Sequence, residues 1–84
     1  MSDDQHNHQV LKDLNGQSRE LRQMIPDVYH GFAEMSKAAL GDAGALEPRI
    51  KELIAMAIGV VHGCDGCIAS HARGAVRAGA SRQE

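Results

Sequence analysis

The stretch Glu52-Leu-Ile-Ala-Met-Ala-Ile-Gly-Val-Val-His-Gly-Cys64-Asp-Gly-Cys67-Ile-Ala-Ser-His71 decides the fold of this chain of 84 residues. Its first half is an almost wholly apolar run, and its second half carries the only two cysteines. The His62-Gly63 pair between the two halves allows a turn, because glycine commonly ends a helix. The segment therefore predicts two helices that fold back on each other as an antiparallel hairpin.

The first helix of this hairpin has the clearest helical signal in the chain. Pro48 suits its first turn, where the missing N–H has no helical partner to lose. Past Glu52 the opposite side of the helix is also apolar or small, so we expect it to be buried nearly all round. The apolar positions recur at i, i+3, i+4, i+7, i+8 and i+11: Ile50, Leu53, Ile54, Ala57, Ile58 and Val61.

The remaining segments complete a small all-α domain. Residues 1–9 are polar and predict a disordered tail, so the predicted domain spans residues 10–84. Ser81 and Glu84 have the spacing of a capping box, so we expect a C-terminal helix to begin there and to be cut short. Helical spacing, proline and glycine predict further helices over residues 10–24, 26–40 and 65–78, with a loop at 41–46.

Composition limits both the core and the partners. Tyr29 and Phe32 are the only aromatic residues, and a domain of this size buries little more than about 60% of its unfolded surface. We therefore expect a small antiparallel helical bundle that is completed by oligomerisation. The net charge is −2, without a stripe of Lys and Arg, which predicts no nucleic-acid partner.

The apolar runs and the N-terminus predict where the protein acts. The N-terminus lacks the features of a signal peptide, and the run from Leu53 to Val61 is about half as long as a membrane span. We therefore expect a cytoplasmic protein without a membrane partner. In a reducing compartment a cysteine pair is more often catalytic or metal-binding than a structural disulfide.

Cys64 and Cys67 stand at the start of the helix predicted over residues 65–78. Residues three apart on a helix share a face, so the two sulfur atoms can approach bonding distance. The free amide groups and the dipole of a helix N-terminus favour a thiolate, which is the form of cysteine that attacks. The pair is therefore a candidate redox-active disulfide.

His71 and Glu52 are the candidate proton carriers. His71 follows Cys67 by one turn on the same face, where it can bond to the sulfur or carry its proton. A hairpin that turns at His62-Gly63 places Glu52 and His71 at similar heights. A poorly solvated carboxylate suits proton transfer. The alternative for Glu52 is a first-turn residue that only interacts with the helix dipole.

The order of Glu52, eleven residues, Cys-x-x-Cys, three residues and His71 resembles the core motif of the AhpD-like alkyl hydroperoxidases in the carboxymuconolactone decarboxylase family. The resemblance covers residues 25–84 and is most specific from 46 to 81. It implies an all-α fold, homotrimers or homohexamers, and a thiol-dependent peroxidase. The best-studied branch has a further histidine immediately before the second cysteine, where this sequence has Gly66.

The resemblance also implies the catalytic roles. Cys67 matches the peroxidatic cysteine, and Cys64 matches the cysteine that closes the disulfide. His71 and Glu52 match the proton relay. The implied substrate is a hydroperoxide, and the implied reductant is an external dithiol or a lipoyl protein, without a bound cofactor. The decarboxylase branch lacks the cysteine pair, so lactone decarboxylation is not expected.

Two other readings of the residues stay open. His62, Cys64, Cys67 and His71 are ligand types that zinc accepts, although structural zinc sites usually draw on two separated pairs. The same disulfide could also serve a non-enzymatic redox sensor or partner-binding module. A zinc assay and a peroxide-consumption assay separate these readings from a peroxidase.

Overall fold

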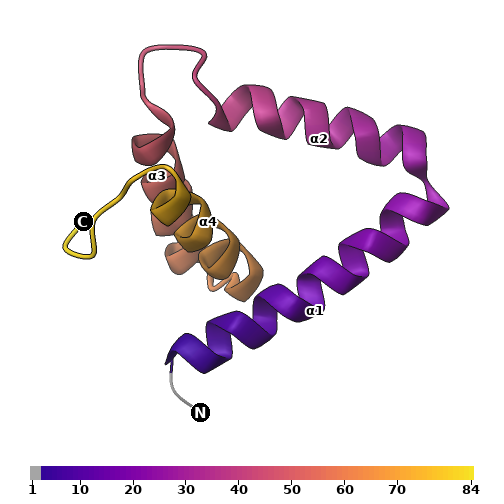
Figure 1. Cartoon of the computed structure of the whole chain (residues 1–84), viewed down its shortest axis with the longest axis horizontal. Helices are drawn as coiled ribbons and strands as arrows, with labels where there is room; N and C mark the ends of the chain where they lie inside the picture. Colours follow the sequence, from indigo (N-terminus) through magenta and orange to yellow (C-terminus); the bar gives the residue numbers. More distant parts are fainter. Residues whose placement is uncertain (1–2) are drawn as a thin grey trace.

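The chain folds into four helices, as seen in a computed structural model that describes residues 3–84 (Figure 1). The helices are α1 (Asp3–Met24), α2 (Pro26–Leu40), α3 (Pro48–His62) and α4 (Asp65–Arg77). No strand occurs among the described residues, so the predicted all-α class is confirmed. None of these helices combines the length and the apolar character that crossing a membrane requires.

Helices α3 and α4 form the predicted hairpin and make the most extensive contact between any two helices (Figure 1). Gly63 ends α3 in the left-handed region, with φ of 68°, which glycine adopts without the steric cost of a Cβ. The Cys64 N–H then donates to Gly59 O at 2.9 Å, which turns the chain directly into α4. Gly59 is buried at this contact, where its missing Cβ leaves room for the Cβ of Cys67.

Helix α1 begins earlier than predicted. The expectation of a disordered tail over residues 1–9 is wrong from residue 3 onward, and residues 1–2 lie outside the described part of the chain. Residues 3–15 contain neither proline nor glycine, and this part of α1 packs against α4. The His6 imidazole lies 3.5 Å from the Asp65 carboxylate at the start of α4. Tertiary contact therefore supports a segment whose composition alone favours disorder.

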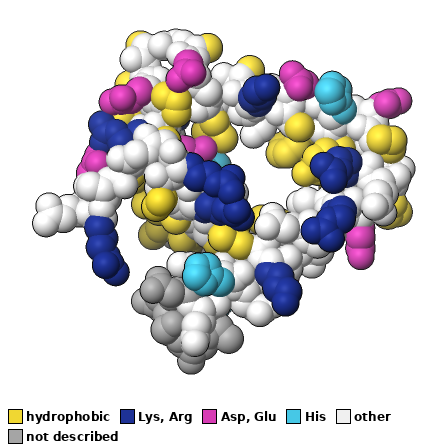
Figure 2. All heavy atoms as spheres, viewed as in Figure 1, with side chains coloured by type: hydrophobic (Ala, Val, Ile, Leu, Met, Phe, Trp, Pro, Cys, Tyr) yellow, Lys and Arg dark blue, Asp and Glu magenta, His cyan; other side chains and the backbone are white. Residues whose placement is uncertain are grey.

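Helix α2 begins at Pro26 and ends before Gly41, as predicted, but it has no buried residue. Figure 1 shows that α2 starts at the end of α1 far from the hairpin and runs back towards the loop that leads into α3, and Figure 2 shows hydrophobic side chains open along it. The expectation that α3 is buried nearly all round is also wrong for the single chain, because only α4 covers it extensively. The exposed apolar residues of α2 and α3 are Val28, Phe32, Met35, Ile54, Ile58, Val60 and Val61.

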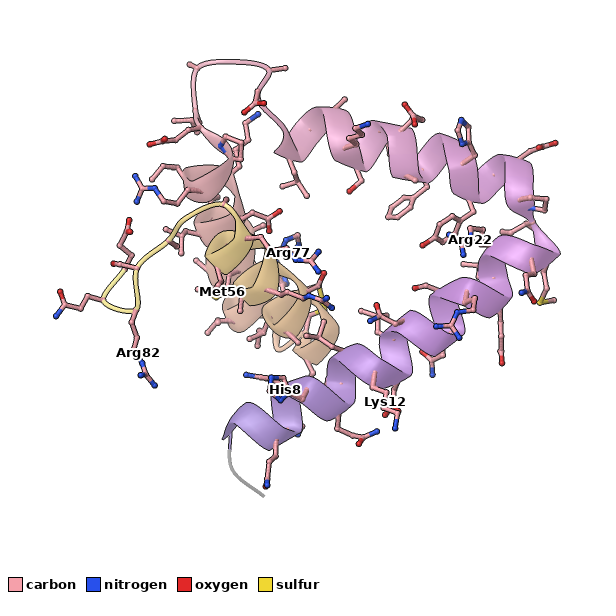
Figure 3. The ribbon with its side chains drawn as sticks, in the orientation of Figure 1. His8, Lys12, Arg22, Met56, Arg77 and Arg82 are labelled. Carbon is pink, nitrogen blue, oxygen red and sulfur yellow. A yellow bond between two sulfur atoms is a disulfide. The ribbon has the colours of Figure 1, made fainter. Side chains whose placement is uncertain are left out.

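A groove of ≈ 860 Å³ lies between α1 and α4, on the side of α4 that faces away from α3. Its floor includes Leu11 and Ala69, and its rim carries cationic side chains. Figure 3 shows His8 and Lys12 on α1 and Arg77 on α4 around this groove. The groove is separate from the cysteine pair, which occupies the α3-facing side of α4.

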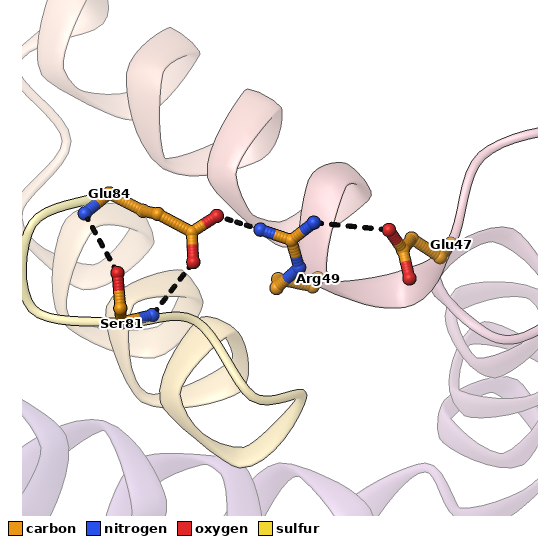
Figure 4. Close-up of polar contacts among 4 residues, drawn as sticks. All are labelled: Glu47, Arg49, Ser81 and Glu84. Atoms are coloured by element: carbon orange, nitrogen blue, oxygen red, sulfur yellow. Dashed lines mark hydrogen bonds and ion pairs between the residues drawn. The ribbon is translucent and has the colours of Figure 1, made fainter.

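The C-terminal residues form the capping-box contacts that the sequence predicts. The Ser81 N–H donates to Glu84 Oε1 at 2.9 Å, and the Glu84 N–H donates to Ser81 Oγ at 3.3 Å (Figure 4). The guanidinium of Arg49, in the first turn of α3, pairs with both Glu84 and Glu47. These contacts tie the segment after α4 to the start of α3.

Candidate active site

Cys64 and Cys67 form a disulfide at the N-terminus of α4, with their Cα atoms 5.2 Å apart. Cys64 is the N-cap residue, and its Sγ accepts a hydrogen bond from the Cys67 N–H at 3.2 Å. The prediction that the two sulfurs approach bonding distance is confirmed. The helix start therefore offers an amide hydrogen to the sulfur of Cys64, which stabilises negative charge on that atom when the disulfide opens.

Glu52 and His71 lie next to each other across the α3–α4 hairpin, as predicted from their similar heights along the two helices. His71 Nδ1 lies 2.8 Å from Glu52 Oε2, although the two residues are 19 positions apart in the sequence. Their side chains are 25% and 12% exposed, respectively, so the pair is largely shielded from water. Since a carboxylate only accepts hydrogen bonds, Nδ1–H donates to Glu52, and Nε2 is the nitrogen left to exchange a proton.

Two glycines make room for these groups. A Cβ on Gly74 of α4 would lie 2.8 Å from Glu52 Oε1 and closer still to Oε2, so the carboxylate fills the space that this glycine leaves. A Cβ on Gly59 of α3 would lie 2.9 Å from the Cβ of Cys67. At these two positions a residue larger than glycine fits only if the helices or the Glu52 side chain shift.

The cysteines and His71 share one cavity of ≈ 320 Å³ at the turn of the hairpin. Its remaining walls are mainly apolar, which limits the water around a reacting sulfur. The complete lining is Ala55, Ile58, Gly59, His62, Cys64, Cys67 and His71. A small molecule that enters this cavity meets both sulfurs and both histidines.

The structure brings together the four residues predicted from the sequence and adds three more to the candidate site. Glu52, Cys64, Cys67 and His71 lie together as expected. Gly59 and Gly74 carry no chemistry of their own, and only the packing of α3 on α4 reveals them. The sequence predicts His62 only as part of the turn or, in the alternative hypothesis, as a zinc ligand. Its place two residues before Cys64 is the signal that could have assigned it to the cavity.

The arrangement does not resemble a zinc site. No cluster of three or more His, Cys, Asp or Glu side chains in the described part of the chain has the geometry to hold a metal ion. The two sulfurs are bonded to each other, and Nδ1 of His71 is bonded to Glu52. Three of the four proposed zinc ligands, Cys64, Cys67 and His71, are therefore already bonded to other groups.

The fold and the site define an all-α protein whose helical hairpin brings a Cys-x-x-Cys disulfide and a shielded Glu–His pair together. The chain belongs to the carboxymuconolactone decarboxylase family, whose sequence model matches residues 26–84. The predicted resemblance is thereby confirmed at the level of the family.

Two relatives of known sequence match the chain over different lengths. The chain is 39% identical over 74 residues to Uncharacterized protein H16_B0147 of Cupriavidus necator, covering 88% of this chain and 65% of that protein. It is 43% identical over 53 residues to Uncharacterized protein 4 in cox locus of Paracoccus denitrificans, covering 63% of this chain and 47% of that protein. The chain therefore spans about half to two thirds of the length of these relatives.

A solved structure shows the same fold. The crystal structure of apo-lpg0406, a carboxymuconolactone decarboxylase family protein from Legionella pneumophila, matches with a TM-score of 0.84 and 38% sequence identity. The match covers 92% of this chain and 68% of that one. Because the match covers nearly the whole chain, it supports the all-α fold as a whole.

Proposed function

We propose that this protein is a thiol-dependent peroxidase that reduces hydroperoxides with Cys67 and Cys64. The observation that carries the proposal is the shared cavity, in which the disulfide lies beside a histidine held by a shielded carboxylate. A cysteine pair supplies the two electrons that reduce a peroxide, and the Glu–His pair supplies a route for the proton. The family includes both peroxidases and decarboxylases, and the cysteine pair favours the peroxidases.

The oxidative half-reaction begins with the dithiol form. His71 Nε2 takes the proton of Cys67, and Glu52 stabilises the resulting imidazolium through Nδ1–H. The Cys67 thiolate attacks the terminal oxygen of the hydroperoxide, the O–O bond breaks, and the leaving alkoxide takes the proton from His71. Cys67 becomes a sulfenic acid, and the substrate becomes an alcohol.

The disulfide then forms within the pair. The Cys64 thiolate attacks the sulfenic sulfur of Cys67, and the hydroxyl leaves as water after it is protonated. The position of Cys64 at the N-cap supports this step, because the Cys67 N–H already points at its sulfur. The product is the Cys64–Cys67 disulfide of the structure.

An external dithiol restores the enzyme. A dithiol of the lipoyl type, free or carried by a protein, donates two electrons and leaves as a cyclic disulfide. We propose that the reaction takes place in the cytoplasm, where such thiols are kept reduced. No bound cofactor is required, because the cysteines hold the electrons between the two half-reactions.

We also propose that the protein acts as a homo-oligomer, a trimer or a hexamer. The support is the row of exposed apolar side chains on α2 and α3, where Val61 alone is 84% exposed. Isolated soluble domains rarely leave such continuous apolar surface uncovered. Ile58 belongs both to this surface and to the wall of the cysteine cavity, so assembly would shield the site.

A steady-state assay tests the proposed activity. The protein is mixed with tert-butyl hydroperoxide and dihydrolipoamide, and peroxide loss is followed for the native chain and for Cys67→Ser. The native chain should consume peroxide catalytically, and Cys67→Ser should fall to the uncatalysed rate. Equal rates for both proteins would exclude Cys67 as the peroxidatic residue. Slow stoichiometric oxidation of the native chain, with a change in assembly, would favour the redox sensor instead.

A further inference from the structure

We propose that His62 is a second acid–base residue of the site, which donates a proton to Cys64 when the disulfide is reduced. The inference rests on the proposed function and assigns a separate histidine to each cysteine. His71 serves Cys67, and His62 serves Cys64. The observation behind it is that the cysteine cavity is lined by two histidines, of which the mechanism above uses only one.

His62 is placed beside Cys64 by the turn of the hairpin. It is the last residue of α3, and Gly63 reverses the chain immediately after it. The hydrogen bond from Cys64 N–H to Gly59 O then holds the N-cap residue close to the final turn of α3. Two residues that are adjacent to the turn on either side therefore face the same small cavity.

His62 also has the freedom that the role requires. Its side chain is exposed, and it makes no hydrogen bond or ion pair with another described residue. His71 differs in this respect, because its Nδ1 is committed to Glu52. An imidazole without a bonded partner can take protons from water and deliver them to a sulfur.

The electrostatics of the disulfide decide which sulfur leaves first and is then protonated. Cys64 Sγ accepts the Cys67 N–H at the start of α4, so negative charge develops more favourably on Cys64 than on Cys67. In thiol–disulfide exchange the better-stabilised thiolate is the better leaving group. An incoming dithiol thiolate therefore attacks Cys67 Sγ, and the electron pair of the S–S bond passes to Cys64.

Reduction of the disulfide takes place in two thiol–disulfide exchanges. The dithiol thiolate forms a mixed disulfide with Cys67, and protonated His62 transfers its proton to the departing Cys64 sulfur. Neutral His62 then takes the proton from the second thiol of the dithiol. That thiolate attacks the mixed disulfide, releases Cys67 as a thiolate, and leaves as a cyclic disulfide. Cys67 regains its proton through His71, so both cysteines end as thiols and the dithiol is oxidised by two electrons.

Measuring the two half-reactions separately tests the assignment. The reductive half uses oxidised protein and dihydrolipoamide without peroxide, and the oxidative half uses reduced protein and tert-butyl hydroperoxide. His62→Gln should slow the reduction about tenfold or more, compared with the roughly hundredfold or larger effect of a fully effective general acid, and should slow the oxidation much less. The matched control is His30→Gln, because His30 is an exposed histidine on α2 and lies outside the cavity.

Two further readouts separate proton transfer from packing. The ratio of the reduction rates of the native chain and of His62→Gln should change with pH, whereas a loss of packing alone would lower the rate by the same factor at every pH. Free imidazole should restore the reduction rate of His62→Ala, because the side chain lies at the exposed end of the cavity. A merely structural role would produce neither effect.

Two results would overturn the inference: a reduction rate of His62→Gln equal to that of His30→Gln, or an equal loss in both half-reactions. The proposed function fails on a different result, which is that the native dithiol form does not react with hydroperoxide. The reductive measurement contains no peroxide, so it decides the role of His62 in either case.

Discussion

The carboxylate of Glu52 lies in the space where any residue other than glycine at position 74 would place its Cβ. Glu52 comes from α3 and Gly74 from α4, so the fit depends on the close approach of the two helices. The same carboxylate holds Nδ1 of His71, three residues before Gly74 on α4. The position of the proton relay therefore depends on a residue with no reactive group.

Gly74→Ala should displace the Glu52 carboxylate and weaken its hydrogen bond to His71. We expect the second-order rate of Cys67 with hydroperoxide to fall about tenfold, since a misaligned general base loses part of its roughly hundredfold or larger effect. Stopped-flow measurement of the single oxidation step gives this rate. Adding Glu52→Asp to Gly74→Ala should recover part of it, because the shorter side chain withdraws the carboxylate from the new methyl group.

Gly31→Ala is the matched control for this change. Gly31 lies within α2, and a Cβ there meets no atom within 4 Å. Alanine should leave the oxidation rate unchanged and stabilise the helix by about 0.5–1 kcal/mol. Equal rates for Gly74→Ala and Gly31→Ala would show that the Glu52–Gly74 contact has no part in the chemistry.

Gly59→Ala should destabilise the fold itself. The new methyl group would lie 2.9 Å from Cys67 Cβ and 3.4 Å from the backbone nitrogen of Ile68, so α4 must move away from α3. We expect a loss of about 1–3 kcal/mol in the free energy of unfolding, which is the usual range for overpacking. Urea denaturation measures it against Gly16→Ala, because Gly16 is helical and its Cβ would have open space. Similar stabilities for the two variants would contradict the close contact.

Glu52→Gln tests the charge of the relay at nearly constant shape. The amide can still occupy the space beside Gly74, but it no longer stabilises an imidazolium on His71. We expect the alkylation of Cys67 by iodoacetamide in the Cys64→Ser background to slow about tenfold or more. Glu47→Gln provides the control, because Glu47 is exposed and pairs with Arg49 far from the cysteines. An unchanged alkylation rate for Glu52→Gln would leave Glu52 with a structural role only.

Replacing an apolar residue of α2 should change the assembly of the protein. Phe32→Glu places a charge in the exposed row formed with Val28 and Met35, so we expect the oligomer to dissociate or to lose subunits. Light scattering after size-exclusion chromatography gives the mass. Lys37→Ser, on the same helix and also exposed, should keep the native mass. A native chain that is monomeric at micromolar concentration would contradict the proposed oligomer.

The sequence was sufficient for the hairpin and for the four reactive residues because these depend on local signals. Gly63 indicates the turn, and the spacing of Cys64 and Cys67 places them on one face of the helix. The rise per residue of the two helices places Glu52 at the same height as His71. Packing between distant segments could not be predicted from such local signals. The burial of α3 was overestimated, because apolar residues alone do not tell whether the chain's own helices or another copy cover them.

The N-terminal segment and the glycines were missed for related reasons. Residues 3–9 have a polar composition, and their helix is supported by contact with α4, which no local pattern reveals. Gly59 and Gly74 look like ordinary helix flaws until the neighbouring helix is in place. In each case the deciding partner lies on another helix.

The most direct test of the central claim is the product that forms on Cys67 when Cys64 is absent. Cys64→Ser keeps a good N-cap residue at the start of α4, so the site should remain folded. After one equivalent of tert-butyl hydroperoxide, mass spectrometry should show one added oxygen atom on Cys67, as a sulfenic acid that dimedone traps. Unmodified Cys67 in a folded Cys64→Ser protein, with the hydroperoxide left unconsumed, would contradict the account.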